Sequence, residues 1–186
     1  CGMVISAKTY EQVALEDPNG HWELDHGCLR QKPGMTAQHD FLMQTLTAEL
    51  MGQLDRSLFL VYMNTMRLRT SDGSFYVPDV TVVPRASVQA ALDLRSTRLD
   101  VYTEAMPLVV EVWSRSTGGY DVETKLLEYQ LRGDAEIWLL HPYDRTLTAW
   151  RLQADGRYTE SVHREGVIEP VALPGVRIEL AALFEA

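Results

Sequence analysis

The chain has 186 residues, of which 46% are hydrophobic and 23% are charged, as in an ordinary globular domain with a substantial core. Asp and Glu outnumber Lys and Arg by 26 to 17, and the resulting net charge of −9 argues against a protein that clamps long nucleic acid non-specifically. The longest apolar run, Leu58 to Met63, is far too short for a membrane span of ~20 residues. We therefore expect one cytoplasmic domain over residues 1–186, with Cys1 and Gly2 as a remnant ahead of Met3.

The first third of the chain predicts two helices and a hairpin. Thr9–Glu16 places apolar side chains at helical spacing behind a threonine that can cap the helix. His21–Leu24 and Cys28–Gln31 flank an Asp-His-Gly turn, and this pattern predicts a small β-hairpin. Thr36–Leu54 is the longest helical pattern, with Thr36 as its cap and a stripe of Phe, Leu and Met side chains along one face.

Strand patterns fill the middle of the chain. Leu58–Met63 and Met66–Thr70 are followed by a Ser-Asp-Gly-Ser turn and then by Phe75–Val83, a predicted strand with Asp79 in its centre. Residues 84–106 are mixed polar, and they predict either a mobile loop or a loop with one helical turn.

The last part of the chain predicts strands around one helix. A buried strand at Leu108–Trp113 precedes a helix over Tyr120–Arg132, which Gly133 ends. The remaining predicted elements are strands at Glu136–His141, Thr146–Leu152, Tyr158–His163 and Val176–Leu180 and a short helix at Ala181–Phe184. This order of elements predicts an α/β fold in one domain.

One charged side chain, Glu111, stands inside the apolar strand Leu108–Trp113. Burial of an ionised carboxylate costs roughly several kcal/mol unless a metal, a lysine or exposure at an open edge compensates it. The next helix presents Asp121 and Lys125, which are four residues apart and share one helix face. The stretch therefore predicts a functional site.

Asp79 and Glu111 have the chemistry of a pair of metal ligands. If their strands are neighbours, the Cα atoms lie ~5 Å apart, and both carboxylates can bind one hard cation such as Mg²⁺. Water on such an ion is the nucleophile in metal-assisted phosphodiester cleavage. A lysine close by would orient the attacking water and stabilise charge that builds up in the transition state.

In combination, these motifs resemble the Uma2 family, which is assigned to the PD-(D/E)XK, restriction-endonuclease-like superfamily. The similarity covers almost the whole chain. It rests on Val77-Pro78-Asp79-Val80, the stretch Pro107–Ser114, Asp121, Lys125, Tyr129, Gly133 and Glu136-Ile137-Trp138, together with His21–Leu24, Gly27 and His39.

The resemblance implies a restriction-endonuclease-like αβββαβ core, with a mixed central sheet flanked by helices and with an extra N-terminal helix and hairpin and extra C-terminal strands. Asp79 and Glu111 would bind Mg²⁺ or Mn²⁺, helped by the backbone carbonyl of Val112. The superfamily's usual lysine lies two residues after the acid, where this chain has Trp113. In Uma2-like sequences a lysine from the following helix substitutes for it, and Lys125 is that residue.

Four further residues are candidates for supporting roles. The resemblance makes His39 and Glu23 neighbours of the site, while Ser114 either helps to hold the site or bonds within its own turn. Asp121 either belongs to the metal site or is an acid of the first helical turn that the helix dipole favours.

Each catalytic candidate also has a simpler interpretation. Asp79 could end a strand and accept hydrogen bonds from a turn, and Glu111 could sit at a solvent-exposed strand end. Lys125 could be a surface lysine paired with Asp121 or Glu128 and contribute only ~0.3–0.5 kcal/mol.

The expected activity is metal-dependent hydrolysis of phosphodiester bonds, with DNA as the expected substrate. A homodimer is expected by analogy, because one small site that cuts duplex DNA must act twice. The alternative is a nuclease-fold module that has lost catalysis and acts in nucleic-acid or protein interaction, in which case the displaced lysine marks the loss.

Overall fold

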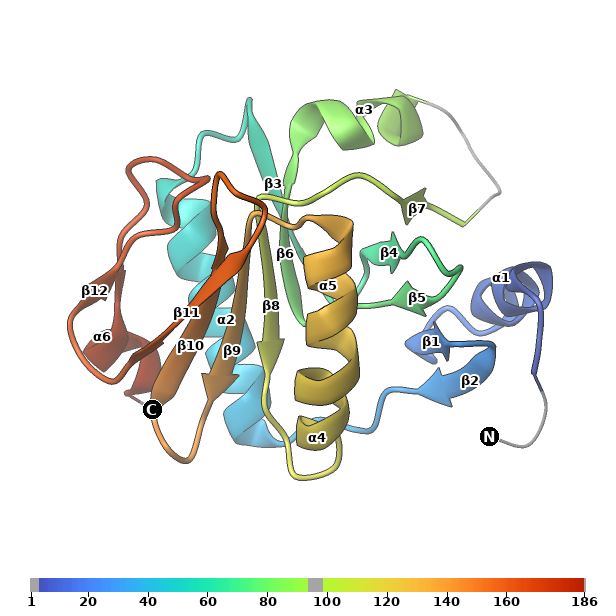
Figure 1. Cartoon of the computed structure of the whole chain (residues 1–186), viewed down its shortest axis with the longest axis horizontal. Helices are drawn as coiled ribbons and strands as arrows, with labels where there is room; N and C mark the ends of the chain where they lie inside the picture. Colours follow the sequence, from blue (N-terminus) through green and yellow to red (C-terminus); the bar gives the residue numbers. More distant parts are fainter. Residues whose placement is uncertain (1–3, 94–98, 186) are drawn as a thin grey trace.

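A six-stranded mixed sheet with helices on both faces forms the centre of the computed structural model, which describes residues 4–93 and 99–185, the side chains of Ala90, Asp93 and Asp121 excepted (Figure 1). The strand order is β11-β10-β9-β8-β6-β3. Its elements are α2 (Ala37–Gln53), β3 (Phe59–Met63), β6 (Val80–Pro84), β8 (Leu108–Val112), α5 (Leu126–Arg132), β9 (Glu136–His141), β10 (Thr146–Leu152) and β11 (Tyr158–His163).

The connectivity of this sheet gives the predicted αβββαβ core. Strands β3, β6 and β8 are antiparallel neighbours, and β8 runs parallel to β9 after the crossover through α5. Strands β10 and β11, which match two strands predicted from the sequence, then extend the sheet by antiparallel pairing. The α/β fold class expected from the sequence is confirmed.

Helices α2 and α5 cover opposite faces of this sheet because β6 and β8 are apolar on both sides. On one face, Leu46 and Leu50 of α2 pack with alternate residues of the strands, such as Val110. On the other face, Tyr129 of α5 packs with the strand residues whose side chains point the opposite way, such as Val109. Helix α2 begins where predicted, since the Thr36 hydroxyl accepts a hydrogen bond from the backbone N–H of His39, the third residue of the helix.

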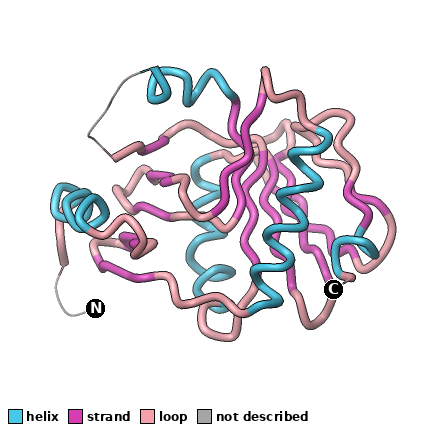
Figure 2. Tube along the Cα trace, turned by 180° about the vertical axis from the view of Figure 1, so that it is seen from behind, coloured by secondary structure: helices cyan, strands magenta, loops and turns pink. Residues whose placement is uncertain are grey.

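A smaller five-stranded sheet lies beside the central one, with the order β2-β1-β5-β4-β7 (Figures 1 and 2). The predicted N-terminal hairpin pairs with the strand that leads toward Asp79, through the register Leu24↔Phe75. The elements of this part are α1 (Ala7–Glu16), β1 (Trp22–Asp25), β2 (Cys28–Gln31), β4 (Arg67–Arg69), β5 (Phe75–Tyr76) and β7 (Val101–Tyr102).

The predicted strand Phe75–Val83 is broken in the structure, and this corrects the placement of Asp79. Strand β5 ends at Tyr76 and β6 begins at Val80, because Pro78 has no N–H to give to a ladder. Asp79 therefore lies immediately before β6 rather than in the centre of a strand. At this break its carboxylate contacts Lys32, His39 and the Val112 amide.

Three other boundaries differ from expectation. Residues 84–106, predicted as a loop or a loop with one helical turn, hold a full helix, α3 (Arg85–Asp93), and residues 94–98 of this stretch lie outside the described part of the chain. Ser6, not Thr9, caps α1. The tail strand is shorter than predicted, and the last elements are β12 (Val167–Ile168), β13 (Ile178–Glu179) and α6 (Leu180–Phe184).

The predicted helix Tyr120–Arg132 is present, but it contains a change of helical pitch. It starts as α4 (Gly118–Tyr120), continues as the π-helical turn η1 (Asp121–Lys125) and becomes α5. Gly133 ends it with a φ of 78°, a conformation that favours glycine. Single π turns are common at functional sites, and this one ends at Lys125. No helix among the described residues has the length and apolarity needed to cross a membrane.

Candidate active site

Asp79, just before β6, lies opposite Glu111 of the neighbouring strand β8. Val80 pairs with Val110 in the antiparallel register of β6 and β8, so the residue before Val80 faces the residue after Val110. Both carboxylates are buried, with exposed fractions of 2% for Asp79 and 3% for Glu111. Glu111 is therefore not at a solvent-exposed strand end, which was its simpler interpretation.

Three groups hold the Asp79 carboxylate. Its Oδ2 accepts a hydrogen bond from the Val112 amide at 2.7 Å and lies 3.1 Å from His39 Nε2, and its Oδ1 accepts from Lys32 Nζ at 2.7 Å. Burial raises the pKa of this carboxyl, but the Lys32 ammonium and then His39 outweigh it and hold the pKa well below its ordinary value. Asp79 is therefore ionised at neutral pH.

Lys125 bridges two carboxylates. Its Nζ lies 2.9 Å from Glu23 Oε1 and 3.2 Å from Glu111 Oε1, and its exposed fraction is only 1%. Glu111 Oε1 also accepts from the Tyr129 hydroxyl at 2.7 Å, and Glu23 Oε1 accepts from the Val77 amide at 2.9 Å. Lys125 thus reaches back from the helix to the strand acid, as its place in the sequence suggested, and it is not an exposed surface lysine.

Lys32 is the neighbour that the sequence did not indicate. It lies in the segment between β2 and α2, next to Pro33 and Gly34. The contact between Lys32 and Asp79 joins residues that are 47 positions apart. No local periodicity carries such a contact, so only the three-dimensional pairing of the hairpin with β5 reveals it.

Trp113 and Ser114 organise the turn after β8. The Trp113 indole stacks on His141 with ring centroids 4.3 Å apart and covers Gly118 so closely that a Cβ there would overlap the ring. Ser114 Oγ accepts from the Thr117 amide at 3.2 Å, so it bonds within its own turn. The side chain of Asp121 lies outside the described residues.

The two acids share one small cavity, of about 20 Å³, with His39, Ser114 and the Lys32–Met35 segment. Such a volume admits about one water or ion. Carboxylate and backbone carbonyl oxygens are the hard donors that Mg²⁺ and Mn²⁺ prefer. The donor set of Asp79, Glu111 and the Val112 peptide therefore fits such an ion, although each acid also has an ammonium group beside it.

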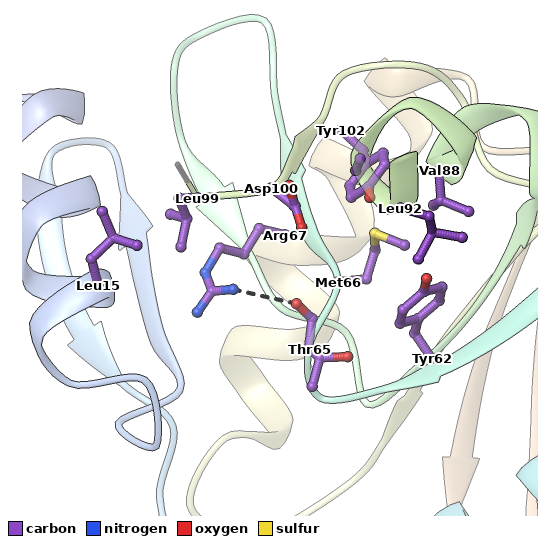
Figure 3. A pocket seen from close by; sticks show the side chains of 11 residues that line it. Leu15, Tyr62, Thr65, Met66, Arg67, Val88, Leu92, Leu99, Asp100 and Tyr102 are labelled. Carbon is purple, nitrogen blue, oxygen red and sulfur yellow. Dashed lines mark hydrogen bonds between the residues drawn. The ribbon is translucent and has the colours of Figure 1, made fainter. Parts of the chain in front are cut away.

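A second cavity, of about 330 Å³, lies between α1, the β3–β4 connection, α3 and β7 (Figure 3). Figure 3 shows the Arg67 guanidinium beside apolar walls such as Leu15 and Met66, with its Nη1 3.4 Å from the Thr65 carbonyl. None of the lining residues in the described chain belongs to the acid–lysine site.

One other group of possible metal ligands occurs in residues 4–93 and 99–185. It consists of His26, Asp72 and Glu128, where the hairpin turn meets α5. His26 Nδ1 lies 2.7 Å from Asp72 Oδ2, whereas the contact to Glu128 is 4.0 Å. This cluster is more exposed than the Asp79–Glu111 pair and lies apart from the cavity between those acids.

Comparison with known proteins relates the chain to nucleases. A family model described as "Uma2: Putative restriction endonuclease" matches residues 7–181. The fold is similar to a crystal structure described as "a putative nuclease belonging to DUF820" from Anabaena variabilis ATCC 29413, with a TM-score of 0.72 and 17% identity, over 88% of this chain and 89% of that one. No curated protein matches the chain. Since the family model extends over nearly every residue of the fold described above, the chain belongs to the Uma2 family.

Proposed function

We propose that this protein is a Mg²⁺- or Mn²⁺-dependent nuclease that hydrolyses phosphodiester bonds in DNA. The observation that carries the proposal is the convergence of two buried acids from neighbouring strands, Asp79 and Glu111, on one small cavity, with Lys125 bonded to Glu111. We further propose that residues 1–186 form a single domain that acts in the cytoplasm as a homodimer, so that two sites can cut the two strands of a duplex.

The roles of the side chains follow from their contacts. Asp79, Glu111 and the Val112 carbonyl would hold the ion, which when bound supplies Lewis acidity and an activated water. Lys125 orients the attacking water and stabilises negative charge at phosphorus. Tyr129 fixes Glu111 by its hydrogen bond to Oε1.

Glu23 and His39 act as positioning residues. Glu23 holds the Lys125 ammonium together with Glu111, and His39 holds Asp79 Oδ2. Ser114 keeps the turn beside the cavity closed through its hydrogen bond with Thr117.

Cleavage of supercoiled plasmid and linear duplex with Mn²⁺, Mg²⁺ or EDTA tests the proposal. We expect cleavage that EDTA abolishes, with loss in Asp79→Asn and Glu111→Gln. Lys125→Met should keep ion binding and lose cutting. The control is Asp155→Asn, at an exposed turn between β10 and β11. Equal cleavage by wild type, Asp79→Asn and Glu111→Gln would refute the site, and no cleavage of DNA or RNA would refute the enzyme.

Light scattering on the intact chain tests the dimer.

A non-catalytic module is the second candidate function. The observation that favours it is that Lys32 and Lys125 already lie against the two acids, while Trp113 stands where the superfamily has its usual lysine. On this alternative the protein binds DNA without cutting it. Fluorescence anisotropy with labelled duplex and the plasmid assay on the same sample separate the two candidates.

A further inference from the structure

The Lys32 ammonium lies within hydrogen-bonding distance of three oxygens. Its Nζ donates to Asp79 Oδ1 at 2.7 Å, to Asn64 Oδ1 at 2.7 Å and to the Val77 carbonyl at 2.8 Å. An ammonium group has three N–H donors, so this arrangement uses all of them. The side chain of Lys32 is 11% exposed and that of Asp79 is 2% exposed. The pair is therefore held away from bulk water.

The three oxygens are fixed by contacts that do not involve Lys32. The side-chain amide nitrogen of Asn64, Nδ2, lies 3.0 Å from the sulfur of Met43, and this contact orients the amide so that Oδ1 points toward the Lys32 ammonium. The Asn64 backbone N–H donates to the Asp79 carbonyl at 3.0 Å. The Val77 carbonyl comes from the break between β5 and β6, where the Val77 N–H donates to Glu23. The chain has thus built a cage of hard oxygens for a cation.

We propose that Lys32 is a tethered counter-cation of Asp79, which a divalent ion must displace from Asp79 Oδ1 in order to bind. The inference rests on the proposed metal-binding role of Asp79. An ammonium and a divalent ion on one buried carboxylate repel each other strongly, since few water molecules screen them. Lys32 therefore lowers the affinity of the site for divalent ions and sets the concentration at which it fills.

The Lys32 contact is separate from that of Lys125. Lys125 lies against Glu111 and Glu23, whereas Lys32 lies against Asp79. Lys32 also lines the small cavity with Glu111 and Ser114. An ion that enters this cavity therefore meets the Lys32 ammonium beside its first carboxylate ligand.

Mn²⁺ binding to Lys32→Met without DNA tests the inference. Methionine keeps most of the side-chain length and removes the charge. We expect calorimetry and the electron paramagnetic resonance of free Mn²⁺ to give a Kd at least roughly tenfold lower than wild type, since one charge-assisted hydrogen bond no longer competes. Lys8→Met, at an exposed position of α1, is the matched control with unchanged Kd. An unchanged or higher Kd in Lys32→Met would overturn the proposal, since a purely structural lysine would give that result.

A measurement on wild type keeps the inference testable if Lys32→Met does not fold. The chain has three lysines, Lys8, Lys32 and Lys125, so Lys8→Met and Lys125→Met assign two ¹⁵Nζ signals of the labelled protein and leave the third to Lys32. We expect the Lys32 signal to change with the same midpoint as Mg²⁺ binding. A Lys32 signal that stays constant at saturating Mg²⁺ means that the ammonium has not moved, and the proposal is then wrong.

The two proposals fail in different ways. Absence of cleavage with tighter Mn²⁺ binding by Lys32→Met refutes the nuclease and supports the displacement. Mn²⁺ binding by Asp79→Asn with wild-type affinity overturns both, because Asp79 is then not a ligand.

Discussion

Replacing Lys125 by methionine should destabilise the fold as well as abolish cleavage. Lys125 is 1% exposed and lies 2.9 Å from Glu23 Oε1 and 3.2 Å from Glu111 Oε1. Its ammonium also lies 5.4 Å from the centroid of the Tyr120 ring. The substitution leaves the two buried carboxylates of Glu23 and Glu111 without the positive charge that both contact.

The size of the effect can be estimated from these contacts. Each charge-assisted hydrogen bond contributes about 1.5–3 kcal/mol, so two of them suggest a loss of roughly 3–6 kcal/mol. Breaking a buried ion pair by removing one partner costs about 3–5 kcal/mol, which lies within the range estimated from the two hydrogen bonds. We therefore expect the free energy of unfolding to fall by about 3–5 kcal/mol at pH 7.

Urea denaturation followed by the fluorescence of the four tryptophans measures this loss. In a Glu23→Gln background, Lys125→Met should lower the free energy of unfolding by about 1–3 kcal/mol less, because only one of the two buried carboxylates then loses its counter-charge. Lys8→Met, which is exposed, should stay within about 0.5 kcal/mol of wild type. A loss below about 1 kcal/mol, or the same loss in both backgrounds, would refute the argument that Lys125 compensates a buried pair of acids.

Three further predictions concern residues outside the acid–lysine site. Burial raises the pKa of Asp134 to about 6 against the opposing pull of Arg132. The folded state therefore binds a proton more tightly than the unfolded state, and this group destabilises the fold as pH rises from about 4 to about 6. Relative to wild type, Asp134→Asn should become more stable by up to about 3 kcal/mol between pH 4 and pH 7 in urea titrations, and a constant difference would contradict the shift. Gly118→Ala would place a Cβ 1.9 Å from Trp113 Nε1. It should cost about 1–3 kcal/mol and alter tryptophan emission, whereas unchanged emission and stability would show that the indole moves freely. Thr36→Ala removes the cap of α2 and should cost about 1 kcal/mol in thermal unfolding; an unchanged melting temperature would mean that water replaces the hydroxyl.

The core elements could be predicted because their patterns are local. The apolar run around Val110, the stripe of α2 and the turn at Gly133 each specify an element within about 20 residues. The pairing of Asp79 with Glu111 was predicted on the condition that their strands are neighbours, and the register of β6 and β8 meets that condition.

The rest of the site depends on contacts that no pattern carries. Lys32 reaches Asp79 only because the hairpin docks against β5, and Glu23 of β1 in the small sheet meets Lys125 at the end of the π turn. The π turn before α5 adds one residue to a helical turn, which the apolar spacing of a short helix does not reveal. The break at Pro78 was visible as a residue without an N–H, but its effect on the direction of Asp79 was not.

The small sheet has a consequence for how this protein can be divided or engineered. Glu23 and Lys32 come from the first 35 residues, while their partners Lys125 and Asp79 belong to the αβββαβ core. A fragment that starts at α2 would retain every element of that core, yet it would leave one buried ammonium and one buried carboxylate short of a counter-charge. The N-terminal hairpin is therefore part of the minimal folding unit. Circular permutants should retain the hairpin so that it can still dock on the core.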